Sequence, residues 1–341
     1  MTNDKEFAWG LIGPGRIAGR FAEAVGRLPD TRLARVLGRD LARAEAFAAR
    51  WVDQQGRVPP AGADLAALLA DPAIDAIYIA TPHAQHGAAL RACLDAGKAV
   101  LCEKPLVPTL AEGQALVALA RERRVFLMEA LWTRFLPIYE LLGGWLREQR
   151  IGALRAIQSS FCFPAPYDPQ SRLFNPALAG GALLDIGIYN LSVTRWVLQQ
   201  ALGECPDYRS LQVDGLLAPS GVDQRLAATL MFPGGISSQF VCALDACADN
   251  ALRLYGSRGS IVLPTRFWQA TEAVLQVQGE PEERVSLPFR INGFEGEIEE
   301  AMRCARAGLI ESPRMPHDES LATLAWMDEM RRRLGLRYPF E

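Results

Sequence analysis

The segment FAWGLIGPGRIA, residues 7–18, joins a short apolar run to a glycine-rich turn and then to a helical pattern. Gly13 permits a tight turn, Gly15 lets the backbone approach a pyrophosphate, and Ala18 allows the helix to pack closely on the strand. The N–H groups at the start of the helix then face the phosphates. The two residues that open the helix, and that we expect at the phosphates, are Arg16 and Ile17. A plain glycine-rich turn can share this pattern, but its place directly after an N-terminal strand favours a dinucleotide-binding unit.

The same alternation continues through the first 130 residues. Short apolar runs rich in β-branched residues are separated by segments with apolar residues three and four apart, which is typical of β–α–β units on a parallel sheet. The predicted strands are 7–12, 32–37, 76–80, 99–102 and 125–128, with a poorer one near Val58. The predicted helices are 17–27, 41–51, 65–70, 87–96 and 110–123. Asp40, Asp64 and Thr109 are placed to cap the helices that follow them.

After about residue 130 the pattern changes to strands joined by hairpins. Glycine-rich turns at 233–235 and 256–259 separate paired strand-like runs. The predicted strands are 154–163, 225–232, 236–244, 252–255 and 261–263, and the predicted helices are 138–149, 182–202, 296–308 and 319–334. Residues 209–290 offer too few helices to cover both faces of a sheet, so one face is either wet or an oligomer interface.

These patterns predict an α/β protein of two domains. The first, residues 1–128, is a Rossmann dinucleotide-binding domain with a doubly wound parallel sheet. The second, residues 129–341, is an α+β domain with an open, mainly antiparallel sheet. A length of 341 residues with 50% hydrophobic side chains is sufficient for two cores.

Composition excludes several classes of protein. A net charge of -3, without a basic block longer than the three arginines at 331–333, argues against a nucleic-acid partner. The seven cysteines form no CxxC pair, which disfavours a disulfide framework or a cysteine zinc site, and three histidines leave little material for a catalytic metal. The first apolar run is too short for a signal peptide or membrane span. We therefore expect a soluble cytoplasmic protein with no metal, no nucleic-acid partner and no membrane association.

The residues after the second predicted strand indicate which dinucleotide is bound. An NAD enzyme usually has an acidic residue there for the ribose 2′-hydroxyl, whereas this strand runs into Gly38, Arg39 and Asp40. Gly38 leaves room, and Arg39 supplies a permanent cation for a 2′-phosphate. The alternative is that Arg39 is one more surface arginine and that Asp40 binds the ribose. We favour Asp40 as a helix N-cap, and we predict NADP(H) in preference to NAD.

Two further strand tips lie at the carboxyl edge of the sheet, where an open α/β sheet binds its ligand. The first carries Thr81, Pro82, His83 and His86, and the two histidines fit a nicotinamide site or, equally, a loop histidine and a helix cap. The second tip carries Lys104. The 36 basic residues comprise 33 arginines and only three lysines, Lys5, Lys98 and Lys104. Because arginine cannot be deprotonated whereas a buried lysine can exchange a proton near neutral pH, Lys104 is a candidate catalytic residue.

A third group of candidates lies in the second domain. Asp185 and Tyr189 are four residues apart in the segment GGALLDIGIY, residues 180–189, and so share one face of the predicted helix. A carboxylate and a phenol aligned in this way can point into a cleft, although Tyr189 could instead be core and Asp185 a surface charge. A substrate pocket with an aromatic wall could be built from Trp132, Phe161, Phe163, Tyr167 and Phe174, most of which are equally plausible as core.

Together these motifs resemble the Gfo/Idh/MocA oxidoreductases, and within them the branch of dimeric dihydrodiol dehydrogenases and NADP-dependent D-xylose dehydrogenases. The resemblance runs from Trp9 to Glu341. It rests on GLIGPGRIA, TPHAQH, AGKAVLCEKP, MEALWTRFLP, RLFNPALAGGALLDIGIYN and MPHDESL. The Glu-Lys-Pro and GGALLDIGIY segments at this separation are specific, whereas the dinucleotide fingerprint is not.

The resemblance implies hydride transfer between NADP(H) and a hydroxyl or hemiacetal carbon of a sugar, polyol or cyclic diol. It makes Lys104 and Tyr189 the acid/base pair, with Asp185 orienting them. It also places Glu103 near the nicotinamide ribose and Trp132 in the substrate pocket. It assigns substrate binding and oligomerisation to the second domain, residues 129–341, with dimers or tetramers formed through the sheet. Many relatives have histidine where Tyr189 stands, and a serine often precedes the arginine where this chain has Gly38.

Two alternatives stay open. One is an oxidoreductase that keeps its nucleotide bound and shuttles hydride between two sugars. The other is a non-catalytic NADP-sensing protein on the same scaffold. Lys104, Asp185 and Tyr189 together disfavour the sensor, because a sensor needs only the fingerprint of the first domain.

Overall fold

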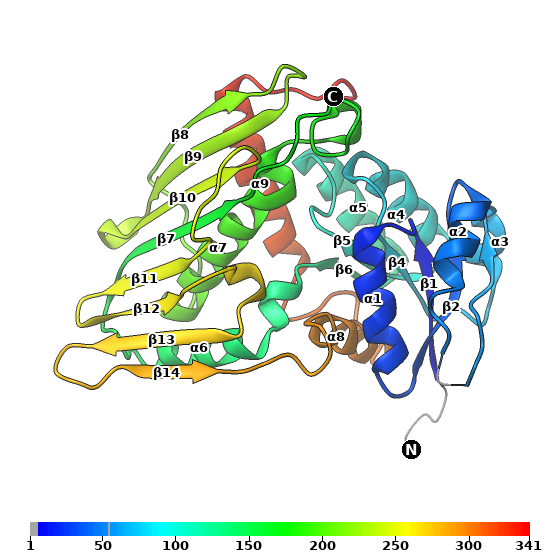
Figure 1. The fold of residues 1–341 in the computed structure, drawn as a ribbon, viewed down its shortest axis with the longest axis horizontal. Helices are drawn as coiled ribbons and strands as arrows, with labels where there is room; N and C mark the ends of the chain where they lie inside the picture. The colour runs from blue at the N-terminus through cyan, green and yellow to red at the C-terminus, as the bar shows by residue number, and fades with distance from the viewer. Residues whose placement is uncertain (1–5, 54) are drawn as a thin grey trace. The chain divides into compact units, whose positions relative to one another are not determined.

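The computed structural model describes residues 6–53 and 55–341. The chain forms two compact units (Figure 1). The first unit contains the chain up to Trp132 together with Arg290–Leu321, and the second contains Thr133–Phe289 and Ala322–Glu341. The division therefore differs from the predicted single boundary after residue 128, because a late segment returns to the first unit.

The first unit is built on a six-stranded parallel sheet with strand order β3-β2-β1-β4-β5-β6. Every residue of β1, β4 and β6 is buried, so the centre of the sheet is covered on both faces, as expected for a doubly wound fold. The strand order reverses direction between β1 and β4, and this is where such sheets bind ligands. The strands are β1 Phe7–Ile12, β2 Thr31–Leu37, β3 Ala61–Gly62, β4 Ala76–Ile79, β5 Ala99–Glu103 and β6 Leu127–Ala130.

The helices of the first unit follow the predicted pattern closely. Their bounds are α1 Arg16–Arg27, α2 Leu41–Ala48, α3 Leu65–Ala70, α4 His86–Asp95, α5 Leu110–Arg123 and α8 Glu295–Arg306. The three predicted caps are confirmed: Asp40, Asp64 and Thr109 accept the backbone N–H three residues later. The poor strand expected near Val58 is wrong. Pairing begins only at Ala61, after the two prolines at 59 and 60, which have no N–H to donate.

The late helix α8 belongs to the first unit because the segment before it is bound to α1, and Figure 1 shows the two helices side by side. The side-chain amide of Asn292 donates to the Arg20 carbonyl at 2.9 Å, and the Arg20 guanidinium donates back to the Asn292 carbonyl at 2.5 Å. The same guanidinium lies 4.6 Å from the ring centre of Trp132 and 5.2 Å from that of Phe294. These cation–π contacts each add attraction beyond packing alone.

One of the scarce lysines has a structural role in this unit. Nζ of Lys98 donates to the carbonyl oxygens of Asp71 and Ile74, at 2.6 and 2.9 Å. It thereby ties the start of β5 to the loop before β4. A compact ammonium with three rotatable donors suits two converging carbonyls, whereas the planar fork of arginine is shaped for carboxylates and phosphates.

The second unit is built on an eight-stranded sheet with strand order β14-β13-β12-β11-β7-β10-β9-β8 (Figure 1). All neighbours are antiparallel except β7 and β10, which are parallel, so the sheet is mainly antiparallel as predicted. Both predicted hairpins are confirmed, whereas β8, β13 and β14 had no predicted counterpart. The strands are β7 Leu154–Cys162, β8 Ser210–Leu217, β9 Asp223–Met231, β10 Ser237–Ala243, β11 Leu252–Gly256, β12 Gly259–Leu263, β13 Glu272–Val277 and β14 Glu283–Ser286.

Helices pack on one face of this sheet. They are α6 Pro137–Arg147, α7 Ile188–Leu202 and the part of α9 (His317–Leu334) from residue 322 onward. The predicted helix 182–202 is corrected at its start, because Leu183–Gly187 form a π-helical turn before α7 begins. The segment Pro176–Leu202 is long and apolar enough to cross a membrane by composition, with mean hydropathy 1.3. In this structure 89% of that window is buried inside the protein, as in a core helix.

The other face of the sheet is polar and half-exposed. One row of side chains crosses five neighbouring strands in register, and its members are Gln212, Thr229, Gln239, Gln158 and Arg253. The amide of Gln158 donates to that of Gln239 at 3.0 Å. These residues line a shallow cavity of about 560 Å³.

Three titratable groups are buried together in the first unit. The Tyr78 hydroxyl donates to Oε1 of Glu103 at 2.5 Å. Glu297 of α8 is fully buried, and neither of its carboxylate oxygens has a hydrogen-bond partner among residues 6–53 and 55–341. Burial raises the pKa of Glu297 well above its ordinary value, the Glu103 carboxylate raises it further, and Arg20 opposes both. The raised pKa favours the neutral, protonated form of Glu297 in the folded protein.

This arrangement predicts how stability depends on pH. The folded protein keeps a proton on Glu297 that the unfolded chain releases above pH 4.5, so the free energy of unfolding falls as the pH rises from 4.5 through the raised pKa. Glu297→Gln keeps the shape and the neutral charge. We expect its gain in unfolding free energy over wild type to grow with pH, by up to about 1.4 kcal/mol per pH unit within that window. Urea denaturation between pH 5 and 8 measures it.

The matched control is Glu299→Gln on the same helix, where the side chain is half-exposed and paired with Arg290. Its pH slope should equal that of wild type. A Glu297→Gln protein with the wild-type slope would show that Glu297 is charged in the fold.

Candidate functional site

The turn after β1 is shaped by a close contact with the end of β4. Gly13 has φ +92°, and a Cβ there would lie 2.8 Å from the backbone of Ala80 and Thr81, so only glycine fits. A Cβ on Gly15 would instead meet a single atom, 4.0 Å away, which leaves the space above this residue open. The turn thus has a closed side packed against β4 and an open side at the start of α1.

The open side fits a dinucleotide. Gly15 is the N-cap of α1 and offers no side chain to the first N–H groups of the helix, which are the groups that bind a pyrophosphate. Beside this turn, the buried hydroxyl of Thr81 has no hydrogen-bond partner among the described residues. An orphaned hydroxyl next to uncapped N–H groups is explained by a polar ligand that satisfies both. Arg16 and Ile17 begin α1 as predicted.

The end of β2 carries the predicted cofactor-selecting residues. The Asp40 carboxylate accepts the Arg43 N–H at 3.1 Å as the N-cap of α2, and Arg39 is exposed beside it. A Cβ on Gly38 would lie 3.0 Å from the ring of Pro14. Gly38 was predicted to leave room for the nucleotide. In the structure its lack of a side chain also makes room for Pro14 in the turn after β1.

The two histidines after β4 differ in their surroundings. His86 is fully buried as the first residue of α4, and its ring nitrogens each lie 2.9 Å from a carbonyl, Nδ1 from Pro105 and Nε2 from Thr81. Burial lowers the pKa of His86. This side chain therefore links the loops after β4 and β5, and Gln85 rather than His86 occupies the N-cap position of α4. His83 lies 5.9 Å away, ring centre to ring centre, next to Pro82.

Glu103 and Lys104 end β5 at the same sheet edge. Glu103 is buried and accepts from the Tyr78 hydroxyl with one oxygen and from the Lys104 backbone N–H, at 3.3 Å, with the other. Lys104 is half-buried at the strand tip. The first unit thus brings Gly13, Thr81 and the Glu103–Lys104 pair to the carboxyl edge of its sheet. They follow or end the adjacent strands β1, β4 and β5.

In the second unit, Asp185 lies in the π-helical turn and is almost completely buried. Its carboxylate forms an ion pair with the guanidinium of Arg172 at 2.8 Å. Sequence reasoning missed this pairing because Arg172 lies in an irregular segment with no periodicity to orient it. A fork-like guanidinium fixes the direction of a carboxylate, so Asp185 is oriented from outside its own helix.

Tyr189 is the second residue of α7 and lies beside the first ring of an aromatic group. Its ring centre lies 5.6 Å from that of Phe161 on β7, and Phe161 stacks in parallel on Trp268 with 3.3 Å between ring centres. Trp268 was missed because one tryptophan in a short connecting turn carries no pattern. Phe163 lies at the edge of this group, 6.4 Å from Phe161.

The other predicted substrate residues make different contacts. Tyr167 is 44% exposed and packs edge-on against the buried Phe174, with 5.1 Å between ring centres. Trp132 is buried in the first unit, between Phe294 and the Arg20 guanidinium. Within the second unit, the predicted aromatic side chains thus fall into two groups: Phe161 and Phe163 on the side of Tyr189, and Tyr167 with Phe174.

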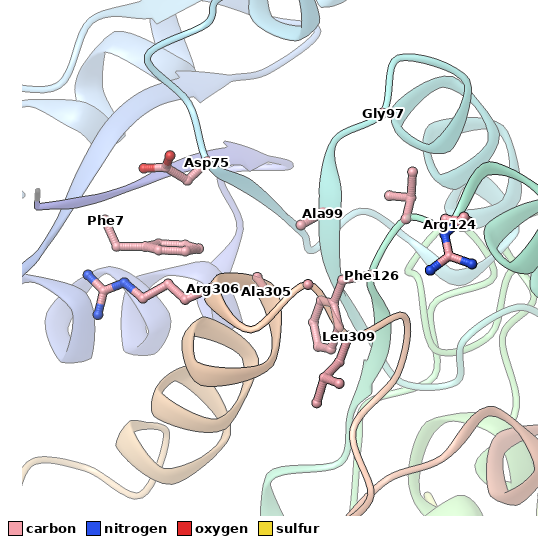
Figure 2. Close-up of a pocket in the computed structure, with 11 residues that line it drawn as sticks. Phe7, Asp75, Gly97, Ala99, Arg124, Phe126, Ala305, Arg306 and Leu309 are labelled. Atoms are coloured by element: carbon pink, nitrogen blue, oxygen red, sulfur yellow. The ribbon is translucent and has the colours of Figure 1, made fainter. Parts of the chain in front are cut away.

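Another cavity, of about 360 Å³, lies at the amino edge of the parallel sheet (Figure 2). Phe7 and Ala99, the first residues of β1 and β5, line it together with Phe126 and Arg306. None of the predicted site residues is among its lining residues. Ligands of open α/β sheets bind at the carboxyl edge, so this cavity lies away from the expected chemistry.

Two family models match the chain. Residues 7–131 match the oxidoreductase family with an NAD-binding Rossmann fold, GFO_IDH_MocA, and residues 139–262 match the GFO/IDH/MocA C-terminal domain. Proteins named trans-1,2-dihydrobenzene-1,2-diol dehydrogenase are similar over their whole length. The protein from Homo sapiens is 35% identical over 97% of this chain and 98% of its own, and that from Danio rerio is 35% identical over 97% of both.

Solved structures agree on the fold. A 3-ketoreductase from Actinomadura kijaniata, in complex with NADP and TDP-benzene, is 26% identical and superimposes with a TM-score of 0.81 over 96% of this chain and 98% of its own. An aldose-aldose oxidoreductase from Caulobacter crescentus has a TM-score of 0.83 over 96% and 97%, and at 22% identity it supports the fold alone.

The family models, the full-length relatives and the motifs at the carboxyl edge of the parallel sheet agree with one another. The chain belongs to the Gfo/Idh/MocA family of NAD(P)-binding oxidoreductases.

Proposed function

We propose that the protein is an NADP(H)-dependent oxidoreductase that interconverts a secondary hydroxyl or hemiacetal carbon and the corresponding carbonyl in a sugar, polyol or cyclic diol. The observation that carries this proposal is the placement of Tyr189 beside an aromatic face, on a helix whose first turn presents the oriented carboxylate of Asp185. The diol dehydrogenases that match the full length of the chain support a cyclic diol within this range.

The first unit supplies the cofactor site in this proposal. A bound nicotinamide nucleotide provides the hydride chemistry. The Gly13–Gly15 turn and the start of α1 bind the pyrophosphate, and the Thr81 hydroxyl donates or accepts one further hydrogen bond. Glu103, already held by Tyr78, is oriented to accept from ribose hydroxyl groups. Pro82, His83 and His86 shape the adjoining loop.

Lys104 and Tyr189 act as the acid/base pair of the proposed reaction. A phenol hydroxyl can donate a proton to a carbonyl oxygen during reduction and recover it during oxidation. The Lys104 ammonium stabilises negative charge on oxygen and can exchange protons, as an arginine cannot. Asp185, fixed by Arg172, holds the turn that carries the phenol.

The aromatic group formed by Phe161, Phe163 and Trp268 is proposed as the surface that receives the carbon ring of the substrate. Aromatic faces pack well against the C–H faces of sugars and against cyclic dienes. A polar acid/base group beside an apolar face is the general composition of small-molecule sites.

A substrate panel tests the proposed function. We expect purified protein to oxidise or reduce at least one member of a set of aldoses, inositols, trans-dihydrodiols and dicarbonyls, with NADP(H) preferred over NAD(H), as followed by absorbance of the reduced nicotinamide. Nucleotide that copurifies and turns over between two sugars would favour the sugar–sugar alternative. Nucleotide binding without turnover of any compound would favour a sensor.

Removal of either acid/base group should reduce turnover. Tyr189→Phe and Lys104→Met should each lower kcat by about 10² to 10⁴-fold, because general acid/base assistance is worth that much, and should leave NADP(H) affinity nearly unchanged. Tyr255→Phe is the matched control, since this tyrosine is 37% exposed on the second unit's sheet. Wild-type kcat in Tyr189→Phe would contradict the assigned role.

Cofactor preference should depend on Arg39. Since Asp40 is occupied as a helix cap, Arg39 is proposed to bind the 2′-phosphate. Arg39→Ala should weaken NADP(H) binding about 10- to 100-fold, the value of one or two charge-assisted hydrogen bonds, without changing NAD(H) binding. Nucleotide fluorescence titration measures both, with Arg43→Ala on α2 as the control. Equal losses for the two nucleotides would argue against a 2′-phosphate contact.

We also propose that the polar sheet face of the second unit forms a homo-oligomer interface, as a dimer or tetramer. Ala227 is exposed there, among the residues that line the shallow cavity. Ala227→Arg places a bulky charge on a flat, self-complementary surface and should dissociate the oligomer in light-scattering chromatography. Glu204→Arg, exposed after α7, should not. A wild-type monomer at micromolar concentration would refute the interface.

A further inference from the structure

The glycine pair before the π-helical turn is enclosed from several sides. The Gly181 N–H donates to the Leu173 carbonyl at 2.8 Å, and the Gly180 carbonyl accepts from the Tyr338 hydroxyl at 2.6 Å. A Cβ on Gly180 would lie 2.6 Å from the Leu173 carbonyl oxygen, so that position also excludes a side chain. The turn that leads into Asp185 and Tyr189 is therefore held by segments distant in sequence.

The helical segment that follows has no cap of its own. Ala182, the residue at its N-cap position, offers no side-chain hydrogen bond. Instead, Oδ2 of Asp223, the first residue of β9, accepts the Leu183 N–H at 2.6 Å. A carboxylate at this end of a helix satisfies an otherwise open donor and faces the positive end of the helix dipole.

Asp223 occupies the space that a side chain at Gly181 would need. A Cβ on Gly181, which has φ +121°, would lie 2.1 Å from Oδ1 of Asp223. Asp223 itself is 1% exposed, and Oδ1 has no hydrogen-bond partner among the residues that the structure describes. A buried carboxylate with one oxygen unsatisfied is costly, so its retention calls for an explanation beyond stability.

We propose that Asp223 is a positioning residue for the acid/base helix: by holding the Leu183 N–H, it fixes the turn from which Asp185, two residues on, and Tyr189, six residues on, are presented. This inference rests on the proposed function of Tyr189. Asp223 touches no reacting group in this proposal, and it acts only through the backbone of the turn.

The strength of this contact varies near neutral pH. Burial raises the pKa of Asp223 to about 7, while its backbone hydrogen bond and the Arg331 cation oppose the increase. The other titratable groups that face it are Tyr338 and Cys242, and burial raises the pKa of each well above its ordinary value, so both stay neutral. Above pH 7 Asp223 is charged, and a charged acceptor binds an N–H roughly twice as strongly as a neutral one.

Three variants separate positioning from general stability. Asp223→Ala removes the acceptor, Asp223→Asn keeps a neutral acceptor of the same shape, and Asp207→Asn is a matched control at an exposed position before β8. We expect Asp223→Ala to lower kcat about 10- to 100-fold, as a misplaced catalytic group does, with NADP(H) affinity unchanged. Asp223→Asn should recover part of kcat, and Asp207→Asn should match wild type.

Hydrogen–deuterium exchange of residues 182–189 gives a readout that needs no turnover. Exchange there should be faster in Asp223→Asn than in wild type, and the ratio of the two rates should increase from pH 6 to pH 8, because only wild type gains a charge. The same ratio for Asp207→Asn should stay near one. If Asp223→Ala does not fold, the Asp223→Asn comparison alone decides.

The inference is overturned if exchange in this segment is the same in wild type and Asp223→Asn at every pH. It is equally overturned if exchange increases while kcat stays at the wild-type value, since Asp223 would then be structural only. Absence of turnover in the wild type would refute the proposed function instead, and the exchange comparison would still decide whether Asp223 holds the turn.

Discussion

The contact between Gly13 and the backbone of Ala80 and Thr81 determines how the first unit is arranged. It brings the turn after β1 against the end of β4, at the place where the order of the parallel strands reverses. Because Gly13 has no side chain, the turn packs directly on Ala80 and Thr81. The uncapped start of α1 and the orphaned Thr81 hydroxyl therefore follow two neighbouring strands, β1 and β4. The dinucleotide binding expected at this edge therefore depends on a backbone contact at Gly13 that even an alanine side chain would prevent.

Features of the fold that depend on local sequence could be predicted. The strands at 7–12 and 76–79 are continuous apolar runs, and the caps Asp40, Asp64 and Thr109 bind N–H groups only three residues away. The edge strands were harder to predict. In β8 and β14 most side chains are exposed or half-exposed, so neither strand has the buried alternation that marks a strand.

The candidate site depends even more than the edge strands on contacts between residues distant in sequence. Lys104, Asp185 and Tyr189 could be singled out because their types and spacing are unusual, whereas their partners come from elsewhere in the chain. Arg172 reaches Asp185 from an irregular segment, and Asp223 reaches Leu183 across 40 residues. Glu297 was likewise not singled out, because it is one of three buried glutamates on α8, with Glu295 and Glu300. A buried acid of this kind becomes meaningful only when its neighbours are known.

The scarcity of lysine has a practical consequence for labelling chemistry. Amine-directed reagents acylate or reductively methylate lysine and ignore arginine, so this chain presents three side-chain targets among 36 basic residues. Lys98 already donates to the carbonyls of Asp71 and Ile74 and is protected as long as that loop stays folded. Isotope-labelled dimethyl groups added to the folded protein would therefore report on Lys104, at the tip of β5, without a signal from the protected Lys98.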